Sequence, residues 1–144
     1  MLNAEFSFNF IIGHIVGDYI LQNNWMALNK KKNILAALVH CLVYTVAICG
    51  SIYQTLLQQS ITKIIIVAIL IFLSHVVLDY TDLVDSFLHT IRGRSWKRSF
   101  DLASKQVNQN IASAIIAYTA IVQTVVDNAL HIIMMYFIFK LILF

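Results

Sequence analysis

Four long apolar stretches dominate this 144-residue chain and limit its fold more than any other feature. They run from residue 6 to about 28, from 34 to about 57, from 62 to about 80, and from 111 to 144. Only 12% of the residues are charged, whereas a soluble domain of this size needs roughly a quarter to cover its surface. We therefore expect an integral membrane protein.

The lengths of these stretches predict the architecture. The first three are each long enough to cross a hydrocarbon core of about 30 Å as a helix. The last is about 50 Å long as one helix, which is too long for one upright span. It forms either two spans with a break near residues 123–128, or one span over about residues 122–142 that follows a surface helix. We favour the second: an all-α membrane bundle of about four transmembrane helices plus an amphipathic helix on the cytoplasmic face, as a single domain over residues 1–144.

The basic residues indicate how the chain is oriented. They gather between the apolar stretches in two clusters, Lys30 to Lys32 and then Arg92, Arg94, Lys97, Arg98 and Lys105. By the positive-inside rule both clusters lie in the cytoplasm, which leaves both termini outside. This predicts a multi-pass membrane protein, with membrane lipids as partners. Because the clusters explain the net charge of +3, no nucleic-acid partner is expected.

Histidines and aspartates inside the apolar stretches form the candidate site. A charged side chain at the bilayer centre costs about 2.5–3.5 kcal/mol on insertion scales, so each one needs a reason. The set contains His14 and Asp18, His40, His75 and Asp79, and Asp127 and His131. Each His–Asp pair has members four residues apart, which share one helix face. Each pair therefore presents an imidazole and a carboxylate to the same neighbouring surface.

The predicted topology brings these seven groups together roughly 5–12 Å below the cytoplasmic face, by helix rise. Three carboxylates there cannot all stay ionised without a counter-charge, and no Lys or Arg is expected at that depth. Either the acids are partly protonated or a cation is bound. Imidazole with carboxylate suits Zn²⁺ first, with Mn²⁺, Fe²⁺ or Ni²⁺ as alternatives. Seven ligands exceed one tetrahedral site, so one metal ion, or two that share a carboxylate, are both open.

Further residues are expected to support the site or to meet a substrate. They are Gln22, Trp25, Lys30, Tyr44, Tyr80 and Asn128, while Asp18, Asp79 and Asp127 are also the candidate catalytic groups. Gln22 is placed to hydrogen-bond a ligating carboxylate or a substrate. For Trp25, Tyr44 and Tyr80, anchoring at the membrane interface is equally open. Lys30 and the second basic cluster are expected at the mouth of the site, where they contact anionic lipid or attract a phosphorylated substrate.

These motifs resemble a domain-of-unknown-function family of small bacterial and phage membrane proteins. That family shows a His-x-x-x-Asp-x-x-x-Gln…Trp-Met-Ala opening, a central His, a second His-x-x-x-Asp and a closing Asp-Gln-x-x-His. Here the same pattern runs from His14 to Ala27, through His40 and His75 to Asp79, and from Asp127 to His131, with Asn128 in place of Gln. The pattern is also similar to YdjM-type inner-membrane proteins, described as membrane-bound metal-dependent hydrolases. The resemblance implies a place in the bacterial inner membrane and metallohydrolase chemistry, but no particular substrate.

We therefore expect a metal-dependent hydrolase within the membrane, with its centre open to the cytoplasmic leaflet. A metal-activated water would attack a phosphoester or ester of an amphiphile, and one carboxylate would carry the proton. Two other classes stay open: a transport protein for metal ions or protons, and a membrane protein whose metal is structural. The outer halves of the stretches are almost wholly apolar, which disfavours a conduit.

Overall fold

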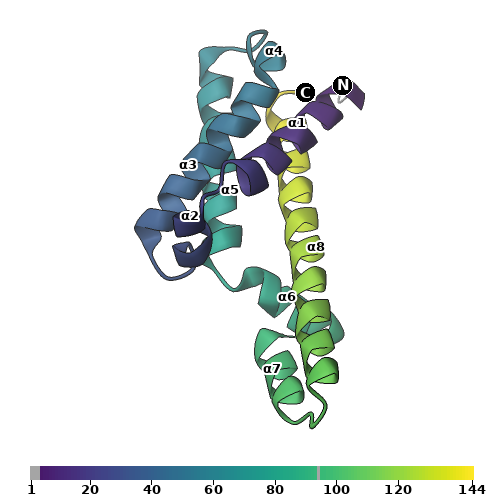
Figure 1. Ribbon diagram of the computed structural model, residues 1–144. Helices are drawn as coiled ribbons and strands as arrows, with labels where there is room; N and C mark the ends of the chain where they lie inside the picture. The colour runs from purple at the N-terminus through teal and green to yellow at the C-terminus, as the bar shows by residue number, and fades with distance from the viewer. Residues whose placement is uncertain (1–3, 94) are drawn as a thin grey trace. The chain divides into compact units, whose positions relative to one another are not determined.

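The computed structural model describes residues 4–93 and 95–144, and the regular structure of these residues is all helical, as predicted. The elements are α1 (Ala4–Ile15), the π-helical turn η1 (Val16–Ile20), α2 (Asn24–Asn29), α3 (Ile34–Ser51), α4 (Tyr53–Leu56), α5 (Ile61–Tyr80), α6 (Leu83–Arg92), α7 (Trp96–Ser104) and α8 (Gln109–Ile142) (Figure 1). They form two compact units. The first contains the described residues up to Thr81 together with His131–Phe144, and the second is Asp82–Leu130. Each unit is described by itself, and the single domain over residues 1–144 remains a prediction.

Among the described residues, three helices are long and apolar enough to cross a membrane: α3, α5 and α8. The first two correspond to the second and third apolar stretches. The two-span alternative for the last stretch is wrong, because α8 is one continuous helix that begins at Gln109 and is not broken near residues 123–128. The single span over about residues 122–142 remains a prediction. Residues 109–142 contain no Gly or Pro, so nothing in this segment interrupts the helix.

The first apolar stretch is not the single helix that was predicted. The π-helical turn follows α1 directly, and in it the Leu21 N–H donates to the Val16 carbonyl five residues back, at 2.9 Å. The chain then breaks before α2, where Asn23 Oδ1 accepts a hydrogen bond from Met26 N at 2.9 Å. Asn23 is therefore the N-cap of a new helix. The polar run at residues 22–24, predicted as the inner end of a span, instead contains the end of a helix break at residues 21–23 and the first residue of α2.

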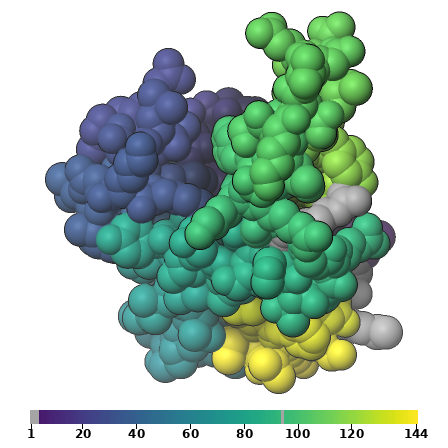
Figure 2. Space-filling model, turned by 90° about the horizontal axis from the view of Figure 1, so that it is seen from below, coloured from purple at the N-terminus to yellow at the C-terminus, as the bar shows by residue number. Residues whose placement is uncertain are grey.

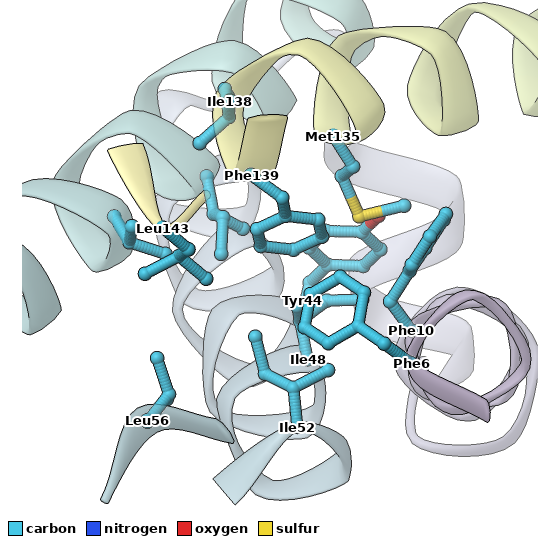
Figure 3. Close-up of a cluster of buried hydrophobic side chains, with 12 residues drawn as sticks. Phe6, Phe10, Tyr44, Ile48, Ile52, Leu56, Met135, Ile138, Phe139 and Leu143 are labelled. Atoms are coloured by element: carbon cyan, nitrogen blue, oxygen red, sulfur yellow. The ribbon is translucent and has the colours of Figure 1, made fainter. Parts of the chain in front are cut away.

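The core of the first unit is a cluster of aromatic and aliphatic side chains from α1, α3, α5 and the end of α8. Figure 3 shows several of these side chains, including Phe6, Tyr44, Ile48 and Phe139, gathered between the helices. Phe6 and Phe139 meet edge to face, with ring centroids 5.2 Å apart. In the space-filling view the last turns of α8, in yellow, lie against the teal segment that holds α4 and α5 (Figure 2). This core fixes the helices that carry the predicted site.

Glycine allows the first helix to approach α3 closely (Figure 1). A Cβ on Gly17 would lie 2.9 Å from Tyr44 Cδ2 and 3.1 Å from Tyr44 Cα, which is closer than side-chain atoms normally pack. Gly13, four residues earlier, faces α3 in the same way. Small residues at this spacing commonly let helix backbones approach in membranes. Because Asp18 follows Gly17 directly, the close approach carries its carboxylate to α3.

In the second unit, a hydrogen bond ties α6 to the first residue of α7. Gly93 ends α6 in the left-handed conformation with φ 60°, and its N–H donates to the His89 carbonyl at 2.8 Å. Asp85 Oδ1 accepts a hydrogen bond from the N–H of Trp96, the first residue of α7, at 2.9 Å. Arg94, a member of the second basic cluster, lies outside the described residues. The amphipathic helix of the prediction falls in this unit, and its place on a membrane face remains a prediction.

The Gly17→Ala substitution is expected to destabilise the protein by about 1–3 kcal/mol, because the added methyl group meets the backbone of α3. Gly50→Ala is the matched control: a Cβ there meets nothing within 4 Å, so the higher helix propensity of alanine should leave stability unchanged or raise it. Thermal unfolding of the two purified variants in detergent measures the difference. Equal melting temperatures would contradict the close packing at Gly17.

Candidate metal centre

Four side chains from three elements of the first unit bring potential metal ligands together. They are Asp18 of η1, His40 of α3, and His75 and Asp79 of α5, and one ligand atom from each lies within 4.8 Å of the others. All four side chains are buried, the most exposed being Asp18 at 7%. These four residues are called the ligand cluster below. The sequence predicted every member of it.

The distances within the ligand cluster are short and similar. His40 Nε2 lies 3.1 Å from Asp18 Oδ1, 3.0 Å from Asp79 Oδ2 and 3.0 Å from His75 Nε2. His75 Nε2 lies 3.6 Å from Asp18 Oδ1 and 3.4 Å from Asp79 Oδ2. Four donors at about 2.0–2.1 Å from a tetrahedral metal ion would stand about 3.3–3.4 Å from one another. The observed separations of these atoms, 3.0–3.6 Å, lie on both sides of that value.

Hydrogen bonding alone does not account for these contacts. Each imidazole Nε2 carries at most one proton, and an ionised carboxylate carries none. The two imidazole nitrogens and two carboxylate oxygens therefore share at most two protons among five close contacts. A cation at their centre would instead meet a lone pair from each atom. The ligand cluster has the composition and the spacing to hold a divalent metal ion.

Tyr44 sets the orientation of two of the histidines. Its ring stacks on that of His75, with centroids 3.6 Å apart and planes 11° from parallel. Its hydroxyl lies 2.9 Å from His14 Nδ1 and donates to Met135 Sδ at 3.2 Å. Neither His40 Nδ1 nor His75 Nδ1 has a hydrogen-bond partner among the described residues, so the His75 ring is oriented by its stacking on Tyr44 and by the contacts of its Nε2. Tyr44 is 1% exposed and lies in the core, not at an interface.

A second pair of predicted histidines faces the other oxygen of each carboxylate. His14 Nδ1 lies 3.8 Å from Asp18 Oδ2, and His131 Nε2 lies 3.7 Å from Asp79 Oδ1. The rings of His14 and His131 stack with centroids 5.7 Å apart. Both carboxylates therefore stand between two histidine pairs, with one oxygen turned toward each pair.

Lys30 supplies a positive charge to the site, and the expectation that no Lys or Arg reaches the acids is wrong. Its Nζ donates to Asp79 Oδ2 at 2.7 Å, and its side chain is 19% exposed. The break in the first helix is the physical reason, because it places α2 and the following loop where Lys30 reaches α5. The orientation of the Gln22 amide is assigned from its neighbours: turned so that its nitrogen donates to the Asp18 carbonyl at 2.9 Å, its oxygen accepts from Lys30 Nζ at 3.2 Å. In this orientation Gln22 contacts Lys30 beside the ligand cluster.

The other predicted residues have different surroundings. Trp25 and Tyr80 are 44% and 39% exposed, which fits anchoring at an interface better than a place in the buried cluster. Asn128 Nδ2 donates to the Thr124 carbonyl of its own helix at 2.7 Å. Asp127 lies one turn before His131 in α8, and both Asp127 and Asn128 belong to the second unit. Their part in the site remains a prediction.

Residues 6–144 match the model of a protein family described as "Protein of unknown function (DUF3307)". Neither a curated protein nor a solved structure matches the chain significantly. The family match covers both units and every residue of the ligand cluster.

Lys30→Met is expected to destabilise the metal-free protein by about 3 kcal/mol, since it leaves the buried Asp79 carboxylate without its cation. Lys31→Met is the matched control, because the hydrogen bond from Lys31 Nζ to the Thr81 carbonyl, at 3.1 Å, is exposed to solvent. Its effect should stay within about 0.5 kcal/mol. Thermal unfolding with a chelator present compares the two. A Lys30 variant as stable as the Lys31 variant would show that the ion pair to Asp79 does not form.

Proposed function

Because the chain belongs to the DUF3307 family, whose description names no activity, we propose its function from the site alone: it is a membrane protein that binds a divalent metal ion. The observation that supports this is the convergence of two imidazole nitrogens and two carboxylate oxygens at 3.0–3.6 Å, away from solvent. Zn²⁺ suits this donor set best, with Mn²⁺, Fe²⁺ and Ni²⁺ as the alternatives.

The apolar surfaces of the long helices support a place in a membrane. On α5, Ile65, Ile69 and Leu73 lie four residues apart on one face and are each about half exposed. A row of exposed apolar side chains on a helix long enough to span suits contact with lipid. We place the chain in the bacterial inner membrane with its basic loops in the cytoplasm, as the positive-inside rule indicates. The likeness to YdjM-type proteins and to phage proteins is part of the same proposal.

The positions of the two carboxylates support a proposal that the site holds a second metal ion. Asp18 and Asp79 each turn one oxygen toward His40 and His75 and the other toward the second histidine pair. Carboxylates placed this way can bridge two ions, as they do in two-metal hydrolytic sites. His131 would then contribute to the second position, whereas the Nδ1 that His14 turns toward Asp18 donates to the Tyr44 hydroxyl.

The chemistry proposed for the site is hydrolysis of a phosphoester or ester of an amphiphile. A bound divalent ion would supply Lewis acidity and activate a water molecule. The protein's own groups have matching roles: Asp18 or Asp79 accepts the proton of the attacking water and returns it to the leaving oxygen. The Lys30 ammonium, partly exposed and beside Asp79, neutralises charge that develops on the substrate oxygens.

A structural metal ion is the alternative function, and the depth of the ligand cluster favours it. His40 and His75 are 0% and 1% exposed, so the protein covers their ring nitrogens closely. A hydrolytic ion needs an open coordination position, whereas structural metal sites are closed. Turnover and metal content must therefore be measured separately.

Elemental analysis after titration with Zn²⁺ or Mn²⁺ tests the metal site. We expect the purified protein to retain metal, and Asp79→Asn and His40→Gln to lower the affinity at least about tenfold, since each removes a ligand. His89→Gln and Asp101→Asn are matched controls, because they change an exposed histidine and an exposed acid of the second unit. Circular dichroism shows that each variant folds. A folded wild type without metal would refute the proposal.

The same measurement counts the ions. Two ions per chain in the wild type should fall to one in His131→Ala, which leaves the ligand cluster intact. One ion in both proteins would restrict the site to a single metal.

Hydrolysis is tested in detergent micelles that contain phosphatidic acid or phosphatidylglycerol, by release of phosphate or of fatty acid. We expect turnover that a chelator abolishes and added metal restores, and at least a tenfold lower rate in Lys30→Gln with metal content unchanged. His89→Gln should keep the wild-type rate. Full metal occupancy with no turnover of either lipid would leave the structural ion as the function.

A further inference from the structure

Within the second unit, α6, α7 and the first half of α8 surround a groove with a cationic end and an apolar end. The cationic end has a volume of about 340 Å³ and is lined by residues that include Arg92, Arg98, Ser99, Tyr118 and Thr119. The apolar end has a volume of about 400 Å³ and is lined by Phe87, Ile91, Ile121, Val125 and Val126, again with Arg92. Both volumes lie in the range of small-molecule sites. Arg92 lines both, so the two cavities adjoin at its side chain, and together they are called the groove below.

The cationic end holds two guanidinium groups from different helices. Arg98 Nη1 donates to the Gly93 carbonyl at 2.8 Å, which fixes its guanidinium beside the end of α6. A Cβ on Gly93 would lie 3.1 Å from that nitrogen, so glycine leaves room for the arginine. A guanidinium has five N–H donors in a fork that matches phosphate oxygens, and this bond uses one of them. Arg92 and Arg98 together suit an anionic group such as a phosphate diester.

The apolar end distinguishes the groove from a site for a free anion. Ile91, Ile121 and Val125 are each more than 60% exposed within it, so they offer an apolar surface that a free phosphate would leave bare. An acyl chain would cover this surface, with a favourable free energy of about 25 cal/mol for each Å² removed from water. A ligand with both an anionic group and a hydrocarbon chain matches both ends.

A buried polar atom lies between the two ends. Gln123 Oε1 has no hydrogen-bond partner among the described residues, and Gln123 lines a small cavity with Leu88, Thr119 and Val122. Thr119 also lines the cationic end and Val122 the apolar end, so this cavity lies at the junction. A buried oxygen that accepts no hydrogen bond costs about 1–3 kcal/mol. The cavity has a volume of about 10 Å³, which is room for about one water molecule, and such a water would satisfy this oxygen.

We propose that this groove binds one anionic phospholipid, with its phosphate between Arg92 and Arg98 and an acyl chain along Ile121 and Val125. The site belongs to the second unit and is independent of the ligand cluster, so the two proposals can fail separately. Charge complementarity with the arginines favours an anionic lipid over a zwitterionic one.

The test is a binding titration of the full chain in detergent with fluorescent phosphatidylglycerol and, in parallel, fluorescent phosphatidylcholine. We expect phosphatidylglycerol to bind at least tenfold more tightly. The double variant Arg92→Gln, Arg98→Gln should lose this preference, while Lys97→Gln, Lys105→Gln should keep it, because those lysines do not line the groove. Val122→Trp should weaken binding of both lipids by filling the junction.

Three outcomes would overturn the proposal. Equal affinity for the two lipids would show an apolar groove without headgroup recognition. If the arginine and lysine double variants lost the same amount of affinity for phosphatidylglycerol, net charge alone would attract the lipid. Competition by millimolar inorganic phosphate as effective as that by unlabelled phosphatidylglycerol would show a site for the free anion. Metal content, measured on the same preparations, should be unchanged in every variant, which shows that the first unit remains folded.

Discussion

Two buried carboxylates are the constraint on which the first unit depends. Asp18 and Asp79 are taken out of water, and an uncompensated charge there costs several kcal/mol per ion. Each element around them contributes a side chain that contacts a carboxylate. These are His40 from α3, His75 from α5, and Lys30 from the loop after α2. The groups that could hold a metal ion are therefore also the groups that tie these helices together. Site and fold depend on the same contacts.

The geometry of the first helix determines which of these contacts can form. Glycine at position 17 brings the backbone against Tyr44, and the π-helical turn that contains Asp18 ends the helix soon after. A regular helix through this stretch would carry residues 21–30 onward along its axis. The break instead returns the chain, so that Lys30 bonds a carboxylate that lies 49 residues away in sequence. One local irregularity thus supplies the counter-charge of the site.

The sequence was sufficient to predict the long helices α3 and α5 and the residues of the ligand cluster. The reason is physical: ionisable groups in apolar helices are costly, and a spacing of four places them on one face. The break before α2 was missed because hydropathy treats the polar run at residues 22–24 as a membrane boundary. The available signal for a new helix start was Asn23, because an N-cap asparagine accepts a hydrogen bond from the N–H three residues later, here that of Met26. The bond from Lys30 to Asp79 follows from tertiary packing, which no local pattern encodes.

The charge around the ligand cluster bears on which substrate the proposed site would accept. One divalent ion brings two positive charges, Asp18 and Asp79 bring two negative ones, and Lys30 adds one more positive charge. A carboxylate oxygen has two lone pairs, so Asp79 Oδ2 can keep Lys30 at 2.7 Å while it binds an ion. With neutral imidazoles the centre then carries one net positive charge in a surrounding of low dielectric. Such a centre stabilises an anionic group more than a neutral one, which favours a phosphoester over a neutral ester as the substrate.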